Sequence, residues 1–505
     1  MQDGLPPLIQ ALTDPACHDH PVEAVRLIET HISYVLLTGT YAYKIKKPLD
    51  LGFLDFSTLA KRQQACLDEV RLNRRLAPEI YLGVVALTGS PTSPRIDGAG
   101  EVVEYAVKMR QFPPDATLDL LDAQGLLEAR HMEAIAATLG QFHLDGCQRA
   151  DADSPWGSPE AVWRPVEQNF LQIAPRLDDP ADSRRLDVLR RWSETEHARL
   201  APRMAQRKRD GLVRECHGDL HLGNLAWVED RLLVFDCIEF NPELRWIDIV
   251  SEVAFCFMDL VHRRHRDWAW LLLNRWLEKT GDHGGLAVLR YYAVYRALVR
   301  AKVAFIRASQ GGDTRDHAVL EGRAYLQLAE DLTRLPALHL DITHGLSGSG
   351  KTTITYTLMQ SDAALRLRSD VERKRLAGLD ALARSGSGVA TGLYSADATR
   401  HLYQHLADLA DGILQAGWPV IVDATFTARW QRDLFRRLAD ARGVEFRILD
   451  FAVAEETLRE RIRQRAQQGG DASEADLAVL RHQLETQEPL AADEQDSVVA
   501  PDNTA

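Results

Sequence analysis

The segment HGDLHLGN, residues 217–224, concentrates residue types that can bind a metal ion or take part in phosphoryl transfer. His217, Asp219 and His221 alternate, and alternate residues of a strand share one face, so they could form part of a zinc cage. A zinc site needs further ligands and partners that orient them. The other dense histidine stretch, VHRRHRD at residues 261–267, falls in a predicted helix, so the sequence favours a different chemistry.

The same segment fits the catalytic loop of a phosphotransferase. Asp219 and Asn224 have the D-x-x-x-x-N spacing that places a base beside a metal-binding amide. After a short predicted hairpin, VFDCIEF puts Asp236 at the end of an apolar strand. Phosphoryl transfer needs a second carboxylate, one that binds the metal, and this is where it belongs. These residue types therefore follow one another in the order that phosphoryl transfer requires.

Phosphoryl transfer also needs a lysine on the phosphates, held by a glutamate. Upstream, YAYKIKKP places Lys44 and Lys46 on one face of a predicted strand, and the helix that follows contains Glu69, which can pair with one of them. A lone glycine, Gly39, precedes the lysine strand where a G-x-G-x-x-G loop is usual. Either the backbone and hydroxyls of the THIS segment replace that loop, or nucleotide binding in this half is weak.

A second phosphate-binding signal lies later in the chain. GLSGSGKT matches G-x-x-x-x-G-K-[ST] at every fixed position, and it follows an apolar strand and precedes a helix. Glycines let the backbone curl so that several N–H groups point at one phosphate, and the helix adds its positive end. Lys351 reaches the β- and γ-phosphates, and Thr352 offers its hydroxyl to Mg²⁺. The predicted nucleotide-binding residues are Gly345, Ser347, Gly348, Ser349, Gly350, Lys351, Thr352 and Thr353.

Asp370, in RLRSDVERKRLAG, comes where a second strand of this half should end. A carboxylate there faces the transferred phosphate and suits a general base that takes the proton of an acceptor hydroxyl. The alternative is a helix N-cap, because Ser369 and Asp370 precede a helical run and both residue types cap well. Arg373 and Lys374 either hold an anionic acceptor or lie on a solvated helix face.

Further along, Asp423 ends the apolar run VIVD and can hold Mg²⁺ through water, as a Walker B carboxylate does. The stretch LRERIRQR then supplies Arg459, Arg461, Arg463 and Arg465. Arg461 and Arg465 share a helix face, so they could close over the phosphates from a mobile lid. The alternative is an exposed face of salt bridges.

The elements that position the first set of residues form a small β-rich region. Residues 22–30 have helical spacing, whereas residues 32–47 alternate around a central TGT, which predicts a hairpin. A charged amphipathic helix is predicted over residues 58–76, before Pro78. Two more strands follow, joined by a turn rich in Pro, Gly and Ser.

From about residue 124 to 210 the pattern is helical. Residues 212–240 interrupt it with loop, strand, turn and strand, and residues 245–333 are helical again. Beyond Pro336, apolar strands alternate with helices, which implies a parallel sheet. The tail AADEQDSVVAPDNTA is polar and lacks periodicity, so we expect disorder.

Composition limits the remaining possibilities. The 505-residue chain suggests roughly two to four domains. Its net charge of -13 argues against a broad electrostatic grip on nucleic acid. The six cysteines lie far apart without a C-x-x-C pair, as reduced buried thiols do. With neither a signal-peptide pattern nor a long apolar stretch, we expect a cytoplasmic protein that does not engage a membrane.

Together, GLSGSGKTT, SDVERKRL, VIVDATF and the arginine-rich helix resemble the small P-loop kinases related to gluconate kinase, polynucleotide kinase and zeta-toxin-type ATPases. The resemblance covers about residues 337–490. It implies that this half binds ATP with Mg²⁺, with Arg461 and Arg465 as lid residues, and it leaves the acceptor open.

HGDLHLGN with FDCIEF resembles the aminoglycoside phosphotransferase group of small-molecule kinases, which share the protein-kinase fold, over roughly residues 25–330. The site residues that this resemblance implies are the base Asp219, the Mg²⁺ ligands Asn224 and Asp236, and the phosphate-contacting Lys44 with its partner Glu69. Lys46 stays an alternative to Lys44. We expect His217 and His221 to shape the loop by hydrogen bonding, and Asp248 to cap or anchor a helix.

The two halves in one chain resemble bacterial proteins that fuse an aminoglycoside-phosphotransferase-like domain to a P-loop ATPase or kinase domain. The expected fold class is therefore two-domain. An α+β protein-kinase-like fold, with a small β lobe and a helical lobe, precedes an α/β P-loop NTPase with a parallel sheet. We place the domains at residues 1–333 and 337–490, with a disordered tail at 491–505.

The expected function is a bifunctional phosphotransferase, in which each half transfers the γ-phosphoryl group of ATP to a hydroxyl of a small molecule. A rival function is a ligand-sensing, kinase-like binding domain coupled to a P-loop ATPase switch, which the missing glycine-rich loop favours. A third, inactivation of an antibiotic, rests on family analogy. The sequence leaves both acceptors and the oligomeric state open.

Overall fold

The structure is a computed structural model, and its described residues form two compact units. It describes residues 5–50, 52, 54–310, 314–386, 391–468 and 473–499, and the side chains of the fifth stretch as far as residue 464. The first unit comprises Met1–Ala134, Phe142–Gln168 and Ala201–Asp259, and the second comprises Ile135–Gln141, Asn169–Leu200 and Leu260–Ala505. The helices from Leu260 onward thus group with the parallel sheet, and the domain limits at 333 and 337 stay a prediction.

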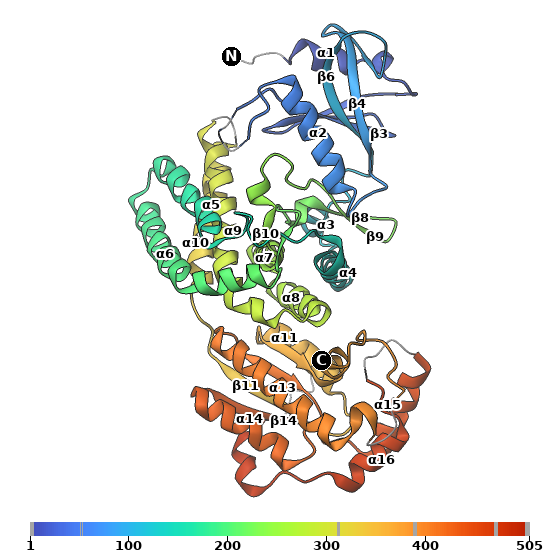
Figure 1. The fold of residues 1–505 in the computed structure, drawn as a ribbon, viewed down its shortest axis with the longest axis vertical. Helices are drawn as coiled ribbons and strands as arrows, with labels where there is room; N and C mark the ends of the chain where they lie inside the picture. Colours follow the sequence, from blue (N-terminus) through green and yellow to red (C-terminus); the bar gives the residue numbers. More distant parts are fainter. Residues whose placement is uncertain are drawn as a thin grey trace. The chain divides into compact units, whose positions relative to one another are not determined.

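The first unit contains the small β lobe of a protein-kinase-like fold (Figure 1). Within the described residues its antiparallel sheet has six strands in the order β1-β2-β3-β6-β4-β5. The strands are β1 Arg26–Glu29, β2 Ser33–Leu37, β3 Tyr41–Lys46, β4 Tyr81–Ser90, β5 Ser93–Ile96 and β6 Val102–Arg110. The predicted hairpin around TGT is confirmed as β2 and β3, with Gly39 in the left-handed region at a φ of 91°.

The helix expected over residues 22–30 is wrong, because Arg26–Glu29 is strand β1. Leu27 and Ile28 pair with Leu36 and Val35 of β2. A backbone ladder with an established hairpin outweighs the helical spacing of a few apolar residues, since strand preference depends on the neighbouring strand.

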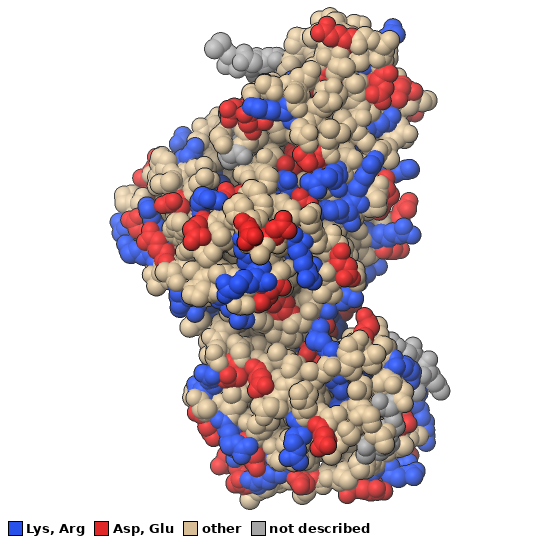
Figure 2. Space-filling model, viewed as in Figure 1, with Lys and Arg blue, Asp and Glu red and all other residues tan. Residues whose placement is uncertain are grey.

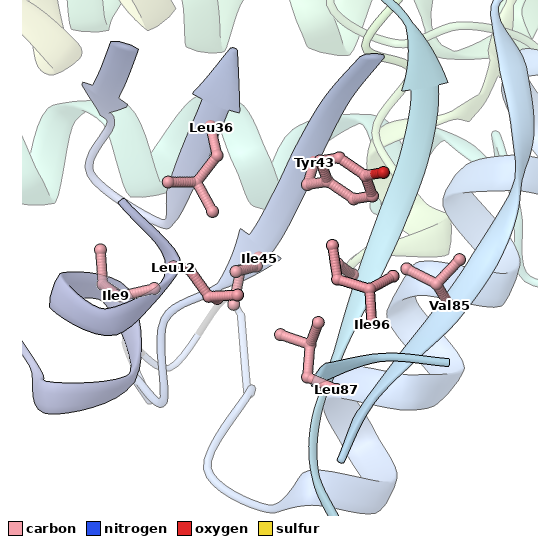
Figure 3. Close-up of a cluster of buried hydrophobic side chains, with 9 residues drawn as sticks. Ile9, Leu12, Leu36, Tyr43, Ile45, Val85, Leu87 and Ile96 are labelled. Carbon is pink, nitrogen blue, oxygen red and sulfur yellow. The ribbon is translucent and has the colours of Figure 1, made fainter. Parts of the chain in front are cut away.

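The two faces of this sheet pack against different helices. One face lies against α1, Pro7–Leu12, and the shared apolar cluster appears in Figure 3. Its labelled members are Ile9, Leu12, Leu36, Tyr43, Ile45, Val85, Leu87 and Ile96. Because side chains alternate along a strand, Lys44 and Lys46 point to the opposite face, where α2 lies.

Helix α2, Leu59–Asn73, begins after Thr58, whose hydroxyl accepts a hydrogen bond of 3.3 Å from the N–H of Lys61. Its residues Cys66 and Val70 pack on Tyr81 and Val107 of the sheet. This contact places Glu69, on the same helix, in the interior beside the lysine strand.

The predicted helical stretches before and after residues 212–240 are confirmed. The helices are α3 Leu118–Ala123, α4 Ala129–Gln141, α5 Pro159–Ile173, α6 Pro180–Arg209, α7 Ile249–His262, α8 Arg266–Thr280, α9 Leu286–Ser309 and α10 Arg315–Leu332. Between α6 and α7 the chain forms two small antiparallel pairs. They are β7 Val213–Glu215 with β10 Trp246–Asp248, and β8 Leu225–Val228 with β9 Arg231–Val234.

The second unit contains the predicted parallel sheet, in the order β12-β13-β11-β14-β15. The strands are β11 His339–His344, β12 Leu365–Arg368, β13 Val420–Asp423, β14 Glu445–Asp450 and β15 Val498–Val499. The helices of this part are α11 Lys351–Ser361, α12 Ser369–Leu376, α13 Ala396–Gln415, α14 Arg429–Arg442, α15 Glu455–Gln468 and α16 Leu477–Thr486. The central strands are buried almost throughout, as in parallel sheets with helices on both faces.

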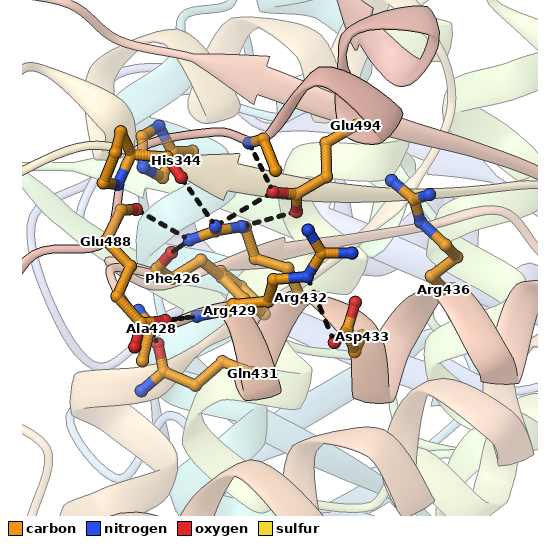
Figure 4. A network of polar contacts seen from close by, with 12 residues as sticks. His344, Phe426, Ala428, Arg429, Gln431, Arg432, Asp433, Arg436, Glu488 and Glu494 are labelled. Carbon is orange, nitrogen blue, oxygen red and sulfur yellow. Dashed lines mark hydrogen bonds and ion pairs between the residues drawn. The ribbon is translucent and has the colours of Figure 1, made fainter.

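The expected disorder from residue 491 is wrong for residues 491–499. Ala492–Ser497 forms a 3₁₀ helix, and Val498 and Val499 pair in parallel with β14. Figure 4 shows the reason, since Glu494 receives two hydrogen bonds, of 2.7 and 3.0 Å, from the buried guanidinium of Arg432. The contact with Arg432 of α14 thus fixes this segment, although its polar sequence has no apolar periodicity of its own. Residues 500–505 lie outside the described residues.

Lysine and arginine side chains are interspersed with aspartate and glutamate on the molecular face in Figure 2. A search of the described helices for an apolar span long enough to cross a membrane found none.

Candidate functional sites

In the first candidate site, the side chain of Glu252 on α7 holds the backbone of the HGDLHLGN loop. Its carboxylate accepts hydrogen bonds from the backbone N–H of His217, at 2.6 Å, and of Gly218, at 3.3 Å. The other oxygen lies 2.8 Å from Nε2 of His143, and all three side chains are buried. The loop is thus anchored to two helices at the residues that lead to Asp219.

The two histidines of HGDLHLGN shape the loop by hydrogen bonding to its backbone, as expected. Nδ1 of His217 accepts from the N–H of Asp219, so Nε2 carries the proton and donates to the carbonyl of Phe235 at 2.8 Å. Burial lowers the pKa of His217, which keeps the ring neutral. Nδ1 of His221 accepts from the N–H of Gly223 at 3.1 Å. These hydrogen bonds account for both rings without zinc.

The structure brings Asp219, Asn224 and Asp236 together. Nδ2 of Asn224 donates to the carbonyl and to a carboxylate oxygen of Asp219, at 2.8 and 3.1 Å. The amide oxygen of Asn224 therefore remains the atom with which this side chain can bind a metal. Phe235 donates its N–H to the Asn224 carbonyl at the open end of the β8–β9 hairpin, so Asp236 lies at the adjacent position on the facing chain.

Lys44 and Glu69 also meet at this site. The ammonium group of Lys44 lies 3.0 Å from a Glu69 oxygen and forms a second ion pair with Asp236. Burial alone lowers the pKa of Lys44, but Asp236 and Glu69 outweigh it and raise that pKa well above its ordinary value. Burial raises the pKa of Asp236, and Lys44 more than reverses this, so the carboxylate is ionised.

Lys46 lies deeper and has a different partner. Its side chain is fully buried between Glu69 and Glu239 and pairs with both carboxylates. Asp236, Lys44, Glu69, Lys46 and Glu239 thus form a row of alternating charges, in which Lys44 contacts the loop that carries Asp236. This arrangement favours Lys44 over Lys46 as the lysine that contacts phosphate.

Sequence reasoning missed Glu239 and Tyr81. Glu239 stands three residues after Asp236 in FDCIEF, so a carboxylate close to a predicted metal ligand was the available signal. The hydroxyl of Tyr81, on β4, accepts a hydrogen bond of 3.1 Å from the N–H of Asp236. Asp236 has a positive φ of 66°, which residues other than glycine seldom adopt. The hydrogen bond to Tyr81 helps to hold this backbone conformation.

The THIS segment, residues 30–33, forms a tight turn between β1 and β2. The hydroxyl of Thr30 both donates to the Ser33 carbonyl, at 3.0 Å, and accepts from the Ser33 N–H, at 2.9 Å. Ile32 packs on a small apolar cluster with Phe56. The Thr30 hydroxyl is therefore engaged within the turn.

Asp248 caps α7 and anchors it to α6, as expected. It accepts from the N–H of Val250 in the first turn of α7 at 3.0 Å. Both of its oxygens also accept from the buried guanidinium of Arg207 on α6, at 2.6 and 2.8 Å.

The second candidate site is the phosphate loop between β11 and α11. Gly345, Gly348 and Gly350 have φ values of 150°, 86° and 92°, so the loop curls as predicted from its glycines. The Lys351 ammonium donates to the carbonyls of Gly345 and Leu346 at 2.9 and 2.7 Å. Lys351 thus lies along the loop whose N–H groups would receive a phosphate.

Thr352 and Asp423 meet at the base of this loop. The Thr352 hydroxyl donates to an Asp423 oxygen at 3.0 Å, and Thr355 donates to the same oxygen at 3.3 Å. A hydroxyl and a carboxylate are oxygen ligands of the kind that Mg²⁺ prefers, so this donor set fits the ion.

A cavity of about 280 Å³ lies over the loop. Its lining includes Ser347, Gly348, Gly350, Lys351, Thr352, Thr353, Asp370, Arg373, Asp423 and Arg461. Six of the eight predicted loop residues and the predicted base, Asp370, therefore border one space, whereas Gly345 and Ser349 are not among the lining residues. Within the described residues Asp370 makes neither a hydrogen bond nor an ion pair, which leaves its carboxylate available.

The N-cap interpretation of Asp370 is wrong, because α12 begins at Ser369 and its N-cap residue is Arg368. The Arg368 side chain makes no capping hydrogen bond. Arg373 lines the cavity, with its guanidinium 4.7 Å from the Tyr394 ring. Lys374 is buried and donates to the Ala381 carbonyl at 2.9 Å, so it is neither on a solvated face nor among the lining residues.

The lid arginines of α15 differ in their partners. Arg461 reaches the Gly348 carbonyl at 3.4 Å, whereas Arg459 and Arg463 form ion pairs with glutamates of the same helix. The side chain of Arg465 lies outside the described residues. Leu346 of the loop packs with Leu458 and Ile462, so α15 contacts the phosphate loop directly.

Two groups of described residues could each offer a metal three ligand atoms within 4.8 Å. They are His143 with Cys216 and Glu252, and His339 with Asp341 and Asp362. In the first, His143 and Glu252 hydrogen-bond to each other. In the second, Arg447 occupies both oxygens of Asp341 at 2.7 Å. Hydrogen bonds therefore explain both groups.

A family model and a curated relative both match this chain. Residues 340–490 match the family model of an AAA domain. Over 476 residues, the chain is 30% identical to an uncharacterized protein of Mycobacterium tuberculosis, a match that covers 92% of each chain.

Two solved structures show a partial likeness to the chain. A Plasmodium vivax ethanolamine kinase has a TM-score of 0.38 and 11% identity, over 60% of this chain and 81% of that one. A Sinorhizobium meliloti gluconokinase has a TM-score of 0.23 and 20% identity, over 33% of this chain and 82% of that one.

Proposed function

The chain belongs to the same family as this mycobacterial protein and joins a kinase-like fold to a P-loop fold, and from that premise we propose that it is a bifunctional ATP- and Mg²⁺-dependent phosphotransferase. Each half transfers a γ-phosphoryl group to a hydroxyl of a small molecule in the cytoplasm. The observation that carries the proposal is the presence of two separate residue sets for handling phosphate, on two different sheets.

In the first half, Asp219 takes the proton of the acceptor hydroxyl, because a base must lie beside the attacking oxygen. Lys44, fixed by Glu69, binds nucleotide phosphate as a charge held in place before the reaction. Asn224 and Asp236 hold Mg²⁺, which neutralises the developing negative charge when it is bound. Glu252 keeps the loop that carries Asp219 in register with these groups.

In the second half, the N–H groups of the curled loop and Lys351 bind the β- and γ-phosphates. Thr352 and Asp423 hold Mg²⁺. Asp370 is the base, since its carboxylate borders the same cavity and has no partner among the described residues. Arg461 closes over the phosphates, and we extend that role to Arg465 from its position one turn along α15.

The test is transfer of label from γ-labelled ATP to components of a small-metabolite extract. We compare the parent protein with Asp219→Asn, Lys351→Ala and the double variant. Asp230→Asn and Lys61→Ala serve as matched controls, because both side chains are exposed. Each site variant should remove one set of labelled products by at least about 100-fold. Unchanged product formation by the double variant overturns the proposal.

A second candidate is a ligand-sensing first half coupled to an ATPase switch. The tight turn at Thr30 and Ser33 favours it, because the hydroxyl there is already bonded within the turn. The same assay separates the two functions. Labelled small molecules that depend on Asp219 support the phosphotransferase, whereas release of bare phosphate that depends on Lys351 alone supports the switch.

A further inference from the structure

Helix α8 covers the edge of the parallel sheet. β12 is an edge strand, and such a strand has backbone groups that need partners. Asn274 of α8 supplies them, since its Oδ1 accepts from the Arg366 N–H at 2.7 Å and its Nδ2 donates to the Ala364 carbonyl at 3.2 Å. Asn274 is buried, so this contact is part of the interior of the second unit.

One turn further along α8, Glu278 contacts the Arg366 side chain. A Glu278 oxygen accepts from the Arg366 guanidinium at 2.9 Å, and the other oxygen accepts from Arg275 at 2.8 Å. The Arg366 side chain is completely buried. Glu278 also lies 4.0 Å from Arg368, which lines the cavity over the phosphate loop.

Arg366 carries this contact into the nucleotide site. Its other terminal nitrogen donates to the Thr352 carbonyl at 3.1 Å and to the Thr355 hydroxyl at 3.5 Å. Both threonines donate to Asp423. An unbroken series of hydrogen bonds therefore links Glu278 to the first turn of α11 and to the expected Mg²⁺ carboxylate.

We propose that Glu278, on a helix outside the P-loop fold, is a positioning residue for nucleotide and Mg²⁺ in the P-loop site. The proposal rests on the proposed function of that half. Glu278 fixes the Arg366 guanidinium, and Arg366 fixes the carbonyl of the residue whose hydroxyl faces the metal.

The physical reason is the cost of a buried cation without a counter-charge. The Arg366 side chain has no exposed surface, and the Glu278 carboxylate lies 2.9 Å from its guanidinium as a counter-charge. If the Glu278 charge is removed, the guanidinium must find water or another acceptor, because an uncompensated buried charge is strongly unfavourable. Any such movement takes its donor away from Thr352, since one rigid guanidinium makes both contacts.

The experiment uses the full chain with Asp219→Asn, so that the P-loop half is measured alone. Into this background we introduce Glu278→Gln, Glu278→Asp and, as a matched control, Asp267→Asn, an exposed carboxylate in the first turn of the same helix. The measurements are the Kd of MgATP by calorimetry, KM and kcat for ATP turnover, and the melting temperature with and without MgATP.

We expect Glu278→Gln to weaken MgATP binding about 10- to 100-fold, as changes behind metal ligands do. The rise in melting temperature caused by MgATP should shrink with it, because that rise measures binding. Glu278→Asp, which keeps the charge, should recover part of the affinity, and Asp267→Asn should match the parent. A merely structural role lowers the melting temperature equally with and without nucleotide.

A Kd for Glu278→Gln equal to that of the parent overturns the inference. Lys351→Ala separates this result from failure of the proposed function. If Lys351→Ala loses MgATP binding and Glu278→Gln does not, only the role of Glu278 is rejected. If Lys351→Ala binds MgATP as the parent does, the function proposed for this half fails first.

Discussion

The hydroxyl of Thr352 donates a hydrogen bond of 3.0 Å to Asp423, although the two residues are 71 positions apart in the chain. Thr352 lies in the first turn of the helix after the phosphate loop, and Asp423 ends the neighbouring parallel strand. Parallel strands bring their carboxyl ends to one edge of the sheet, which is where ligands bind in open α/β sheets. The pair therefore marks the position that we propose for the metal ion in this half.

The Asp423→Asn variant tests that position. The amide can still accept from Thr352, but it lacks the charge that attracts Mg²⁺. In the Asp219→Asn background we expect the Mg²⁺ concentration for half-maximal ATP turnover to rise at least about tenfold. Asp450→Asn is the control, because Asp450 ends β14, another strand of the same sheet, and is not among the cavity-lining residues. An unchanged Mg²⁺ titration for Asp423→Asn contradicts the assignment.

The two buried lysines of β3 should respond differently to substitution. Lys44→Met removes the cation that contacts Asp236, so in the Lys351→Ala background we expect at least about 100-fold less phosphoryl transfer. Lys46→Met leaves Glu69 and Glu239 without their shared cation, and the main effect should be a lower melting temperature. Lys47→Met, whose partner Glu29 is exposed, is the control. Loss of activity in Lys46→Met at an unchanged melting temperature would reverse the two roles.

The pKa of Glu252 predicts how stability depends on pH. Burial by itself raises this pKa, but the hydrogen bond and charge of His143, together with the backbone hydrogen bond from His217, lower it from 4.5 to about 2. A carboxyl with a lowered folded-state pKa stabilises the protein fully above the unfolded value and loses that contribution as the pH falls toward the folded value. The contribution is about 3 kcal/mol at neutral pH.

Urea unfolding of Glu252→Gln and the parent checks this prediction. The stability gap should be constant above about pH 5 and should narrow as the pH falls from about 4.5 toward 2. Asp230→Asn, with a side chain that is 87% exposed, should show a small gap at every pH. A gap for Glu252→Gln that does not change with pH counts against the ionised state of this carboxyl.

Two adjacent acidic residues near the C-terminus should differ sharply in their effect on stability. Glu494 is fully buried against Arg432, and Asp493 is more than half exposed beside Arg429. Glu494→Gln leaves a buried guanidinium without its counter-charge, so we expect a loss of about 3 kcal/mol in the free energy of unfolding. Asp493→Asn should change the urea midpoint little, because an exposed ion pair contributes little. Equal effects of the two variants would contradict the buried role of Glu494.

Where local spacing sets the pattern, the sequence was sufficient to predict the candidate residues. The phosphate loop, the D-x-x-x-x-N pair and Asp236 are each defined within a few positions, and glycine or chain direction sets their geometry. The TGT hairpin could be predicted for the same reason, since its turn and its alternating strands are adjacent in the chain. Pairing of Glu69 with a lysine was also expected, but only the packing of α2 on the sheet decided that Glu69 contacts both Lys44 and Lys46.

The tertiary structure alone decided the contacts between distant segments. Local spacing favoured a helix at Arg26–Glu29, yet pairing with β2 makes this segment a strand. Polar composition favoured a disordered tail, yet Val498 and Val499 pair with β14. Glu252 and Glu278 carry no local signal, and Glu239 has only its closeness to Asp236. A buried carboxylate acquires its role from the group that it meets. The sequence by itself determined which residues can handle phosphate. The fold decided which buried charges hold them in place, since the free energy of a buried charge depends on its neighbours in space.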